Sequence, residues 1–228
     1  SFLDAVSNET VNGTQLRDWG ILPHRTPSLI IDMSSDIMMQ PIPFDRIGML
    51  FASTQKNLGM TGGFALVIVR KDLLECEPHP LLPAPLCFKE QLKHRGGLRN
   101  TVNPLGILSI LYTLEWIREQ GGVDAMAAQA QARAQLLYDT IDGSDGFFEG
   151  LAPPELRSTA NITFRLRDEA RSEDFLKFCA DNGFVGLKGH AAMVKVAGPH
   201  VRASCYIGTT LDEVAELVAA MKGYHQRS

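Results

Sequence analysis

Two side chains with complementary chemistry follow two apolar segments in the N-terminal quarter of the chain. Lys56 follows residues 47–52, and Asp32, twenty-four positions earlier, ends the segment that begins at residue 29. A lysine amine can form a Schiff base with a carbonyl carbon, and a carboxylate can keep a pyridine nitrogen protonated so that the ring accepts electrons. The pair therefore has the two groups that pyridoxal phosphate chemistry requires.

Taken alone, neither residue is specific for that chemistry. A lysine after a strand is more often a solvated surface residue, and an aspartate that precedes Met33 and Ser34 is more often part of a turn or a helix cap. Short motifs of this kind also match by chance. Both interpretations stay open until the flanking sequence is considered.

Four short apolar segments predict the strands that would carry these residues. The segments are residues 3–6, 29–31, 47–52 and 64–69. Because they are continuously apolar and do not alternate, we expect strands that are buried on both faces of an α/β sheet. Sites in such sheets lie at the carboxyl ends of the strands, where Asp32 and Lys56 fall. The glycine-containing turn 59–63 is interpreted as the entry to the fourth strand, since no Lys-Ser or Lys-Thr follows it.

The second half of the chain combines helices with a few strands. Residues 75–99 predict a long loop, after which Pro104 opens a helix that Gly121 ends. Further helices are predicted at residues 123–142, at 172–182 and from the capping box at Thr210, and strands at 162–166, 184–187 and 201–206. The alternation in 162–166 predicts one face in contact with water. We expect two units: residues 1–120, the C-terminal part of a large domain with a mostly parallel sheet, and residues 121–228, a small α+β domain.

Composition limits the classes of function that fit. The chain has 228 residues, of which 45% are hydrophobic, and a net charge of −4, so it lacks the basic surface that nucleic acids or anionic membranes select. No apolar run approaches the roughly 18 residues of a membrane span. The cysteines are widely spaced without a C-x-x-C motif, which indicates reduced thiols in the cytoplasm. His190 and His200 have no second ligand at zinc-like spacing, so no metal site is expected.

Longer strings around Lys56 and Asp32 decide between the two interpretations. They are Ser7-Asn8-Glu9-Thr10, Asp32-Met33-Ser34-Ser35, Gln55-Lys56-Asn57-Leu58-Gly59, Val67-Ile68-Val69-Arg70-Lys71-Asp72-Leu73-Leu74, Asn100-Thr101, Glu115-Trp116-Ile117, Gln120-Gly121-Gly122, Leu136-Leu137-Tyr138, Gly186-Leu187-Lys188-Gly189-His190 and Val201-Arg202-Ala203-Ser204. With these strings the chain resembles the phosphoserine aminotransferases, class V pyridoxal phosphate enzymes of fold type I. The strings occur in the family's order from about residue 5 to the end of the chain.

The resemblance implies how the cofactor would be held. Lys56 would carry pyridoxal phosphate as a Schiff base and then move a proton at the substrate Cα, as general base and acid. Asp32 would pair with the pyridinium nitrogen and keep it protonated. Thr10 would hydrogen-bond the ring hydroxyl, and Gln55 would reach the phosphate. These four residues form the cofactor site that the family match implies for one chain.

The resemblance also implies a second subunit and a substrate pocket. Asn100 and Thr101 would reach the phosphate of the neighbouring subunit's cofactor, which implies a homodimer with shared sites. Arg202 would bind the substrate α-carboxylate, and His190 would lie on the substrate side. Without the family match, Asn100 and Thr101 would be interpreted as a cap for the helix at Pro104. In the same way, Trp116 and Tyr206 would be interpreted as core residues.

Two departures from the family pattern affect these expectations. The chain begins at Ser1 in an apolar strand, and the family's preceding segment, with its phosphate-binding turn and an aromatic that stacks on the ring, is absent. This predicts a truncated chain with an open sheet edge. Ala191 stands where the family has an arginine that helps bind the substrate phosphate, and losing one such contact weakens binding about tenfold or more. Lys195 and His200 are the candidates to replace it.

Three functions follow from these observations. The first is pyridoxal phosphate-dependent transamination between phosphoserine and 2-oxoglutarate, in serine biosynthesis, by a cytoplasmic homodimer whose partners are small amino acids and 2-oxo acids. The second, indicated by Ala191, is another fold-type-I activity with a different substrate. The third, indicated by the absent phosphate-binding turn, is an inactive fragment that serves as a dimerising module.

Overall fold

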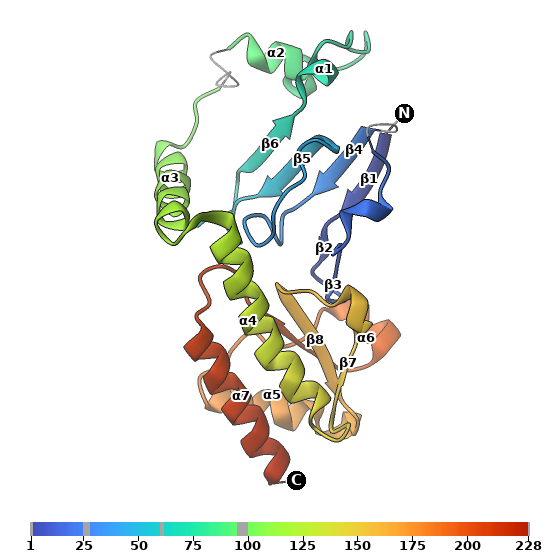
Figure 1. Ribbon diagram of the computed structural model, residues 1–228, viewed down its shortest axis with the longest axis vertical. Coiled ribbons are helices and arrows are strands. Elements are labelled where there is room, and N and C mark those ends of the chain that lie inside the picture. The colour runs from blue at the N-terminus through green and yellow to red at the C-terminus, as the bar shows by residue number, and fades with distance from the viewer. Residues whose placement is uncertain (1, 25–27, 60–61, 95–99, 228) are drawn as a thin grey trace.

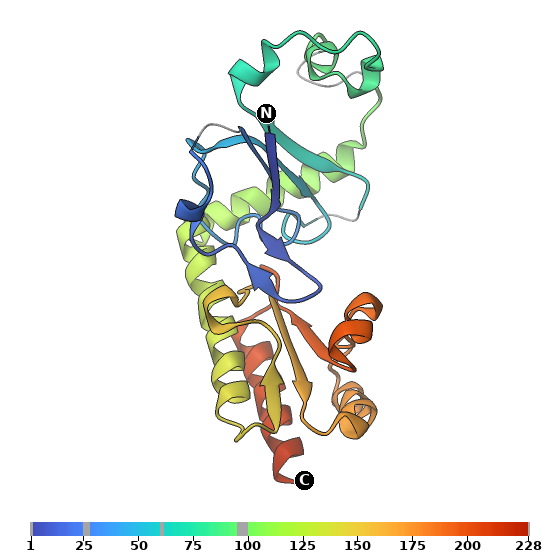
Figure 2. The ribbon, with the colours of Figure 1, turned by 90° about the vertical axis from the view of Figure 1, so that its right-hand side faces the viewer.

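The computed structural model describes residues 2–24, 28–59, 62–94 and 100–227, which form an elongated chain with two lobes (Figure 1). The N-terminal lobe, residues 2–120, carries the larger sheet, and the C-terminal lobe, residues 121–227, carries a smaller one. A view turned by 90° shows the same separation, with the two ends of the chain in different lobes (Figure 2). None of the described helices is long and apolar enough to cross a lipid bilayer.

The sheet of the N-terminal lobe has four strands in the order β1-β4-β5-β6. The strands β1 (Phe2–Val6), β4 (Ser28–Asp32) and β5 (Ile47–Ser53) are parallel, and β6 (Ala65–Val69) runs antiparallel to β5. The prediction of a mostly parallel α/β sheet is therefore confirmed. Leu29, Ile31 and Leu50 from the two central strands are fully buried and belong to one hydrophobic core.

The outer strands of this sheet differ from the prediction. We expected burial on both faces, and β4 and β5 are indeed largely buried, but β1 and β6 alternate between exposed and half-buried residues. Phe2 is 63% exposed and Val67 is 41% exposed. An apolar run reports burial only where something packs on the strand, and the described part of the chain leaves the outer strands partly uncovered.

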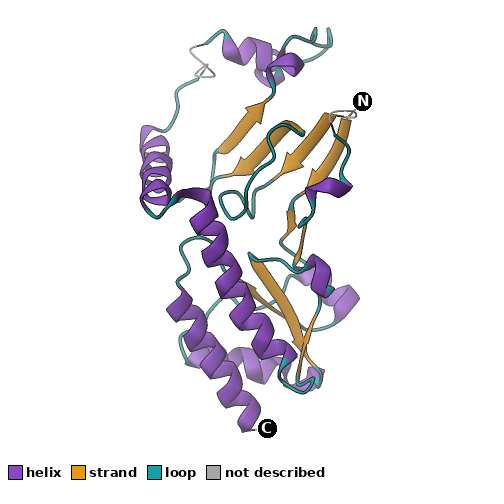
Figure 3. Cartoon of the chain, viewed as in Figure 1, coloured by secondary structure: helices purple, strands orange, loops and turns teal. Residues whose placement is uncertain are grey.

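Short helical turns connect most of the remaining N-terminal lobe (Figure 3). They are η1 (Trp19–Ile21), α1 (Lys71–Leu74), η2 (Ala84–Leu86) and α2 (Phe88–Leu92). The last two interrupt the predicted loop 75–99, whose residues 95–99 lie outside the described residues, as do residues 60–61 of the predicted turn 59–63. A long helix, α3 (Pro104–Glu119), follows, and the side chain of Asn103 caps it by accepting the N–H groups of Leu105 and Gly106.

A glycine separates α3 from the helix that enters the C-terminal lobe. The second helix, α4 (Gly122–Asp142), starts directly after Gly121, whose φ of 102° lies in the left-handed region that glycine adopts without strain. The two helices are the ones that the sequence predicts. The boundary that we placed between residues 120 and 121 falls at the change of direction between them (Figure 1).

The C-terminal lobe is built on an antiparallel sheet in the order β7-β8-β9. Its elements besides α4 are β7 (Phe148–Gly150), η3 (Pro154–Leu156), β8 (Asn161–Leu166), η4 (Glu169–Arg171), α5 (Ser172–Asp181), α6 (Ala191–Ala197), β9 (Val201–Ser204) and α7 (Leu211–Gln226). The capping box at Thr210 is confirmed at the start of α7. The predicted strand at 184–187 is wrong: this segment is irregular, and only the next residue, Lys188, forms an isolated bridge, with Val201.

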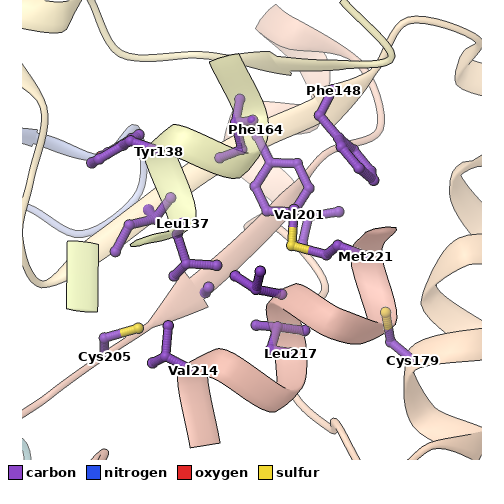
Figure 4. Packing of buried hydrophobic residues seen from close by; sticks show 14 of the residues in the cluster. Leu137, Tyr138, Phe148, Phe164, Cys179, Val201, Cys205, Val214, Leu217 and Met221 are labelled. Atoms are coloured by element: carbon purple, nitrogen blue, oxygen red, sulfur yellow. The ribbon is translucent and has the colours of Figure 1, made fainter. Parts of the chain in front are cut away.

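A closed aromatic core fills the space between this sheet and its helices (Figure 4). Phe164 of β8 is almost fully buried and meets Phe148 and Phe175 with ring centroids 5.5 and 6.3 Å apart. Leu217 and Met221 of α7 pack against the same cluster. Burial raises the pKa of the Cys179 thiol to about 11, which is consistent with a dry interior.

A small hairpin joins the two lobes. Its strands, β2 (Asn8–Glu9) and β3 (Thr14–Gln15), are antiparallel and lie against β8. Gly13 has a φ of +76°, and a Cβ at this position would lie 2.5 Å from the Thr163 hydroxyl oxygen, so the close approach requires glycine. The face of β8 that we predicted to contact water is therefore covered by the hairpin, and Thr163 is buried.

Candidate active site

Three loops meet at the carboxyl edge of the larger sheet. Because β1, β4 and β5 are parallel neighbours, the residues that follow them lie at the same edge. The Ser7 N–H donates to the Asp32 carbonyl oxygen at 3.0 Å, and the Ser53 N–H donates to the Ser34 hydroxyl at 3.0 Å. These bonds hold the three strand ends together, where Asp32 ends β4 and where Thr10 and Lys56 follow β2 and β5.

Lys56 has polar and aromatic neighbours at this edge. It is half-buried, and its Nζ donates a hydrogen bond to the Thr10 hydroxyl at 3.2 Å. The same nitrogen lies 5.8 Å from the centroid of the Tyr206 ring, a distance at which an ammonium group is attracted to the ring face. The amine is therefore ordered between the first strand-end loop of the N-terminal lobe and the C-terminal lobe.

Asp32 ends β4 with a partly accessible carboxylate. Its Oδ1 accepts the Ser34 N–H at 2.8 Å, and no other partner of the side chain occurs among the residues that the structure describes. The second carboxylate oxygen is thus available to an external donor. Its position at the sheet edge shared with Lys56 is the arrangement that the sequence predicted.

A second carboxylate, Asp36, is buried beneath this loop. It accepts hydrogen bonds from the Ser7 hydroxyl, from Gln15 Nε2 at 3.1 Å and from Gln40 Nε2 at 2.5 Å. Burial raises the pKa of Asp36, although the three donors act in the opposite direction. Since the Ser7 hydroxyl also contacts the Asp32 carbonyl oxygen, this group anchors the loop that follows Asp32.

A pocket of about 630 Å³ opens beside Lys56. One wall is a single face of α3, with residues three or four positions apart, and the other wall comes from the segment after β9. The lining residues are Lys56, Gly59, Leu105, Leu108, Ser109, Tyr112, Thr113, Trp116, Ile207 and Gly208. Trp116 is 38% exposed in this pocket, so its interpretation as a core residue is wrong.

The last strand, β9, and the two residues after it contribute a row of half-buried side chains. Arg202, Ser204 and Tyr206 alternate with the buried Val201, Ala203 and Cys205. The Nε of Arg202 is buried and has no hydrogen-bond partner within the described part of the chain. The Tyr206 hydroxyl accepts a hydrogen bond from Asn161 Nδ2 at 3.3 Å. Sequence reasoning assigned Tyr206 to the core and did not consider Asn161, although the alternation after Arg202 was a usable signal.

The family of the chain follows from its sequence profile. The profile of the family described as Aminotransferase class-V matches residues 2–217. The chain belongs to the class-V aminotransferase family. A curated relative of this class-V chain, the phosphoserine aminotransferase of Lysinibacillus sphaericus, is 38% identical to it over 230 residues, which cover 100% of the chain and 60% of the relative.

Solved structures of class-V aminotransferases have the same fold. The phosphoserine aminotransferase from Bacillus circulans subsp. alkalophilus matches with a TM-score of 0.91 and 36% identity, over 99% of this chain and 60% of its own length. The pyridoxal phosphate-bound phosphoserine aminotransferase from Trichomonas vaginalis matches with a TM-score of 0.86 and 33% identity, over 97% and 60%. The chain thus spans about 60% of the length of these relatives.

Four predicted site residues of this class-V chain are exposed to solvent. Gln55 is exposed next to Lys56, and Asn100 and Thr101 are exposed ahead of α3. The alternative role of Asn100 and Thr101 as the helix cap is wrong, because Asn103 fills it. His190 is exposed and caps α6 by accepting the Ala192 N–H on its Nδ1 at 3.2 Å.

The position of the family arginine is the first residue of α6. Ala191 is exposed there, and Lys195 is exposed in the last turn of the same helix. His200 is only 3% exposed, with its ring against Gly189 and its Nδ1 3.1 Å from the Gly198 carbonyl oxygen. Of the two candidate replacements, only Lys195 has access to solvent. Among the described residues, no group of three or more potential ligands could hold a metal ion.

Proposed function

We propose that this class-V aminotransferase moves an amino group between phosphoserine and 2-oxoglutarate, with pyridoxal phosphate attached at Lys56, and so serves serine biosynthesis in the cytoplasm. The observation that carries the proposal is the sheet edge where Lys56 contacts Thr10 and where Asp32 keeps one carboxylate oxygen without a partner in the described part of the chain. Similarity to phosphoserine aminotransferases supports the choice of substrates.

The donors and acceptors at this edge fit the ring of pyridoxal phosphate. An accessible amine lines the pocket, a carboxylate with a free oxygen lies at the end of the neighbouring strand, and a hydroxyl contacts the amine. Asp32 would hold the proton of the ring nitrogen, and Thr10 would bind the ring hydroxyl. When bound, the cofactor supplies the electron sink that makes loss of the substrate Cα proton feasible.

The remaining roles belong to side chains of this chain. Lys56 Nζ would take the proton from the substrate Cα as a general base and would then hold it as a general acid. Arg202 binds the substrate carboxylate, and its unpartnered Nε is consistent with an external acceptor. His190 would lie on the substrate side, and Gln55 would reach the cofactor phosphate.

A homodimer completes the proposed site. Asn100 and Thr101 are exposed and precede a helix whose apolar side chains are exposed too, with Leu105 at 77% and Tyr112 at 61%. A contiguous apolar surface of this kind marks an interaction site more often than chance. A second copy seated on α3 would place Asn100 and Thr101 toward a neighbouring subunit's cofactor phosphate.

Covalent trapping tests the cofactor role directly. The purified chain is incubated with pyridoxal phosphate, reduced with borohydride and digested for mass spectrometry. We expect a pyridoxyl label on the peptide that contains Lys56, no such label in Lys56→Ala, and an unchanged label in the matched surface variant Lys71→Ala. A parent chain without label on Lys56 would refute the proposal.

Ala191 supports a second candidate, a related amino acid as the substrate in place of phosphoserine. The exposed first residue of α6 offers no cation to a phosphate group. Turnover of phosphoserine, serine and alanine separates the two candidates. If phosphoserine is the substrate, Ala191→Arg should lower its KM about tenfold and leave the KM of alanine unchanged, since one charge-assisted contact is gained. Turnover confined to serine or alanine would favour the second candidate.

Sedimentation tests the dimer. Leu111, on α3 and outside the pocket lining, is 48% exposed, and Leu156, on η3, is 42% exposed. We expect Leu111→Glu to convert a dimer to a monomer, because it places a charge in an apolar interface, and Leu156→Glu to leave the dimer intact. A parent chain that is monomeric at all concentrations contradicts the shared site. A dimer that takes no label on Lys56 would instead indicate a dimerising module without enzyme activity.

A further inference from the structure

The two lobes meet through a buried pair of amides. Asn8 lies on β2 in the N-terminal lobe and Asn161 on β8 in the C-terminal lobe, and both are almost fully buried. Asn8 Nδ2 donates to Asn161 Oδ1 at 2.7 Å. An amide pair without access to water must satisfy its donors and acceptors internally, so the direction that each amide faces has structural consequences.

Ser158 fixes the direction of the first amide. Its hydroxyl oxygen accepts the N–H groups of Ala160 and Asn161, each at 2.9 Å, which occupies both of its lone pairs. The hydroxyl hydrogen must then be donated, and the acceptor is Asn8 Oδ1. Asn8 consequently points its Nδ2 away from Ser158 and toward Asn161.

The first amide fixes the second. Since Asn8 Nδ2 is a donor, Asn161 presents Oδ1 to it and Nδ2 to the opposite side. There Nδ2 donates to the Ser204 hydroxyl at 3.0 Å and to the Tyr206 hydroxyl at 3.3 Å. Tyr206 is therefore the acceptor in its bond with Asn161, and its own phenolic hydrogen is not used in that bond. The described residues offer that hydrogen no other acceptor.

The unused hydrogen belongs to a side chain at the site. The Tyr206 ring centroid lies 5.8 Å from Lys56 Nζ, and Tyr206, two residues past the end of β9, continues the row of half-buried residues that includes Arg202. A guanidinium with an unpartnered Nε and a phenol with a free hydrogen are both donors without acceptors. A carboxylate offers acceptors to both, and charge-assisted bonds of this kind are among the stronger ones.

We propose that Tyr206 is a further ligand-binding residue, which donates its phenolic hydrogen to the substrate carboxylate, and that Asn161 is the positioning residue that keeps this hydrogen available. The assignment rests on the proposed function for the choice of ligand class, a 2-oxo acid or amino acid. The role of Tyr206 differs from that of Arg202, because the availability of its phenolic hydrogen depends on which way the buried Asn161 amide faces.

Calorimetric titration of the purified chain with 2-oxoglutarate tests the assignment. Tyr206→Phe removes only the hydroxyl group, and we expect it to raise the dissociation constant about tenfold or more, the usual cost of one hydrogen bond to a charged group. Tyr224→Phe is the matched control, because this tyrosine binds Asp174 in the C-terminal lobe, and its dissociation constant should equal that of the parent. An unchanged constant in Tyr206→Phe, or a parent that does not bind 2-oxoglutarate, overturns the proposal.

A double variant tests the positioning role. In Asn161→Asp an oxygen replaces Nδ2, so Tyr206 donates its phenolic hydrogen to residue 161 and no longer to the ligand. The added negative charge affects ligand binding whether residue 206 is Tyr or Phe. The further loss of affinity from Asn161→Asp should therefore be smaller in Tyr206→Phe than in the parent. A purely structural role of Asn161 gives equal losses in both backgrounds and refutes the positioning role.

The outcomes separate this assignment from the proposed function. A chain that binds 2-oxoglutarate in a Tyr206-dependent way but takes no pyridoxyl label on Lys56 would remove the proposed function and keep the carboxylate site. A chain that takes the label but binds 2-oxoglutarate equally well after Tyr206→Phe would remove this assignment alone.

Discussion

The two lobes bury their apolar residues to different extents. In the C-terminal lobe, Phe148, Phe164 and Phe175 are in a closed core between sheet and helices. In the N-terminal lobe, the outer strands and α3 keep large apolar side chains exposed, among them Phe2 and Leu105. The candidate site lies on the less covered lobe, at an edge that a hairpin ties to the closed one. The geometry of the site therefore depends on the seam as well as on its own sheet.

The largest expected effect tests the closed core. Phe164→Ala removes a fully buried ring and should lower the free energy of unfolding by about 3–5 kcal/mol. The matched variant Val67→Ala, on the partly exposed β6, should cost less than about 1 kcal/mol. Urea denaturation followed by far-UV circular dichroism measures both. Equal losses would show that the lobes do not differ in the way their burial indicates.

The next effect tests the seam. Gly13→Ala places a Cβ against the Thr163 hydroxyl at a φ of +76°, and we expect a loss of about 2 kcal/mol. Gly62→Ala, which has open space around it, is the control and should stay within about 0.5 kcal/mol of the parent. Both tryptophans, Trp19 and Trp116, lie in the N-terminal lobe, so their fluorescence shows whether a weakened seam unfolds that lobe first. If the unfolding transition of Gly13→Ala coincides with that of the parent, the contact between the hairpin and β8 does not contribute to stability.

A pH series tests the buried carboxyl group under the site. Burial raises the pKa of Asp36 in the folded chain, whereas the carboxyl of the unfolded chain titrates near 3.8. Between these two pKa values the folded state holds a proton that the unfolded state has released, so the free energy of unfolding falls as the pH rises above 3.8. In Asp36→Asn this fall should be absent. Parallel stability curves for parent and variant between pH 4 and 8 would contradict the raised pKa.

The smallest effect is confined to the closed lobe. Thr210 caps α7 by accepting the Glu213 N–H at 3.2 Å, and Thr210→Ala should cost about 1 kcal/mol. Because α7 has no part in the N-terminal lobe, the tryptophan fluorescence midpoint should not move, while the circular dichroism midpoint should. Thr210→Ser retains the capping oxygen and is expected to behave as the parent. A shift of both midpoints by the same amount would indicate that the lobes unfold as one unit.

Local patterns predicted the parts of the fold that carry strong periodicity. The runs before Asp32 and Lys56 became the buried central strands, and the long helices begin next to Pro104, Gly121 and Thr210, which are signals visible in the sequence. Short elements were not predicted, because the three residues of β7 and the seven of α6 are too few to show a periodic pattern. The segment 184–187 is apolar like a strand, but it lies beside the sheet without a ladder.

In the candidate site, too, local patterns predicted some residues and missed others. Asp32 and Lys56 could be placed at one edge because Asp32 ends a strand, Lys56 follows the next one and parallel strands share an edge. Tyr206 and Asn161 could not, since their roles depend on a contact with Asn8, which is 153 positions from Asn161. No local sequence pattern indicates that the amides of Asn8 and Asn161 meet, and only the packing of the two lobes shows this contact.

That separation has a consequence for the synthesis of the protein. At about 5–20 residues per second, a ribosome needs roughly 8–30 s after adding Asn8 before it adds Asn161. Throughout this interval the nascent hairpin lacks its eventual partner strand, and the amide and hydroxyl groups later sealed in the seam are hydrated. Lys56 is added early in that period. Its surroundings are completed only when Tyr206, two residues past the last strand, has left the exit tunnel.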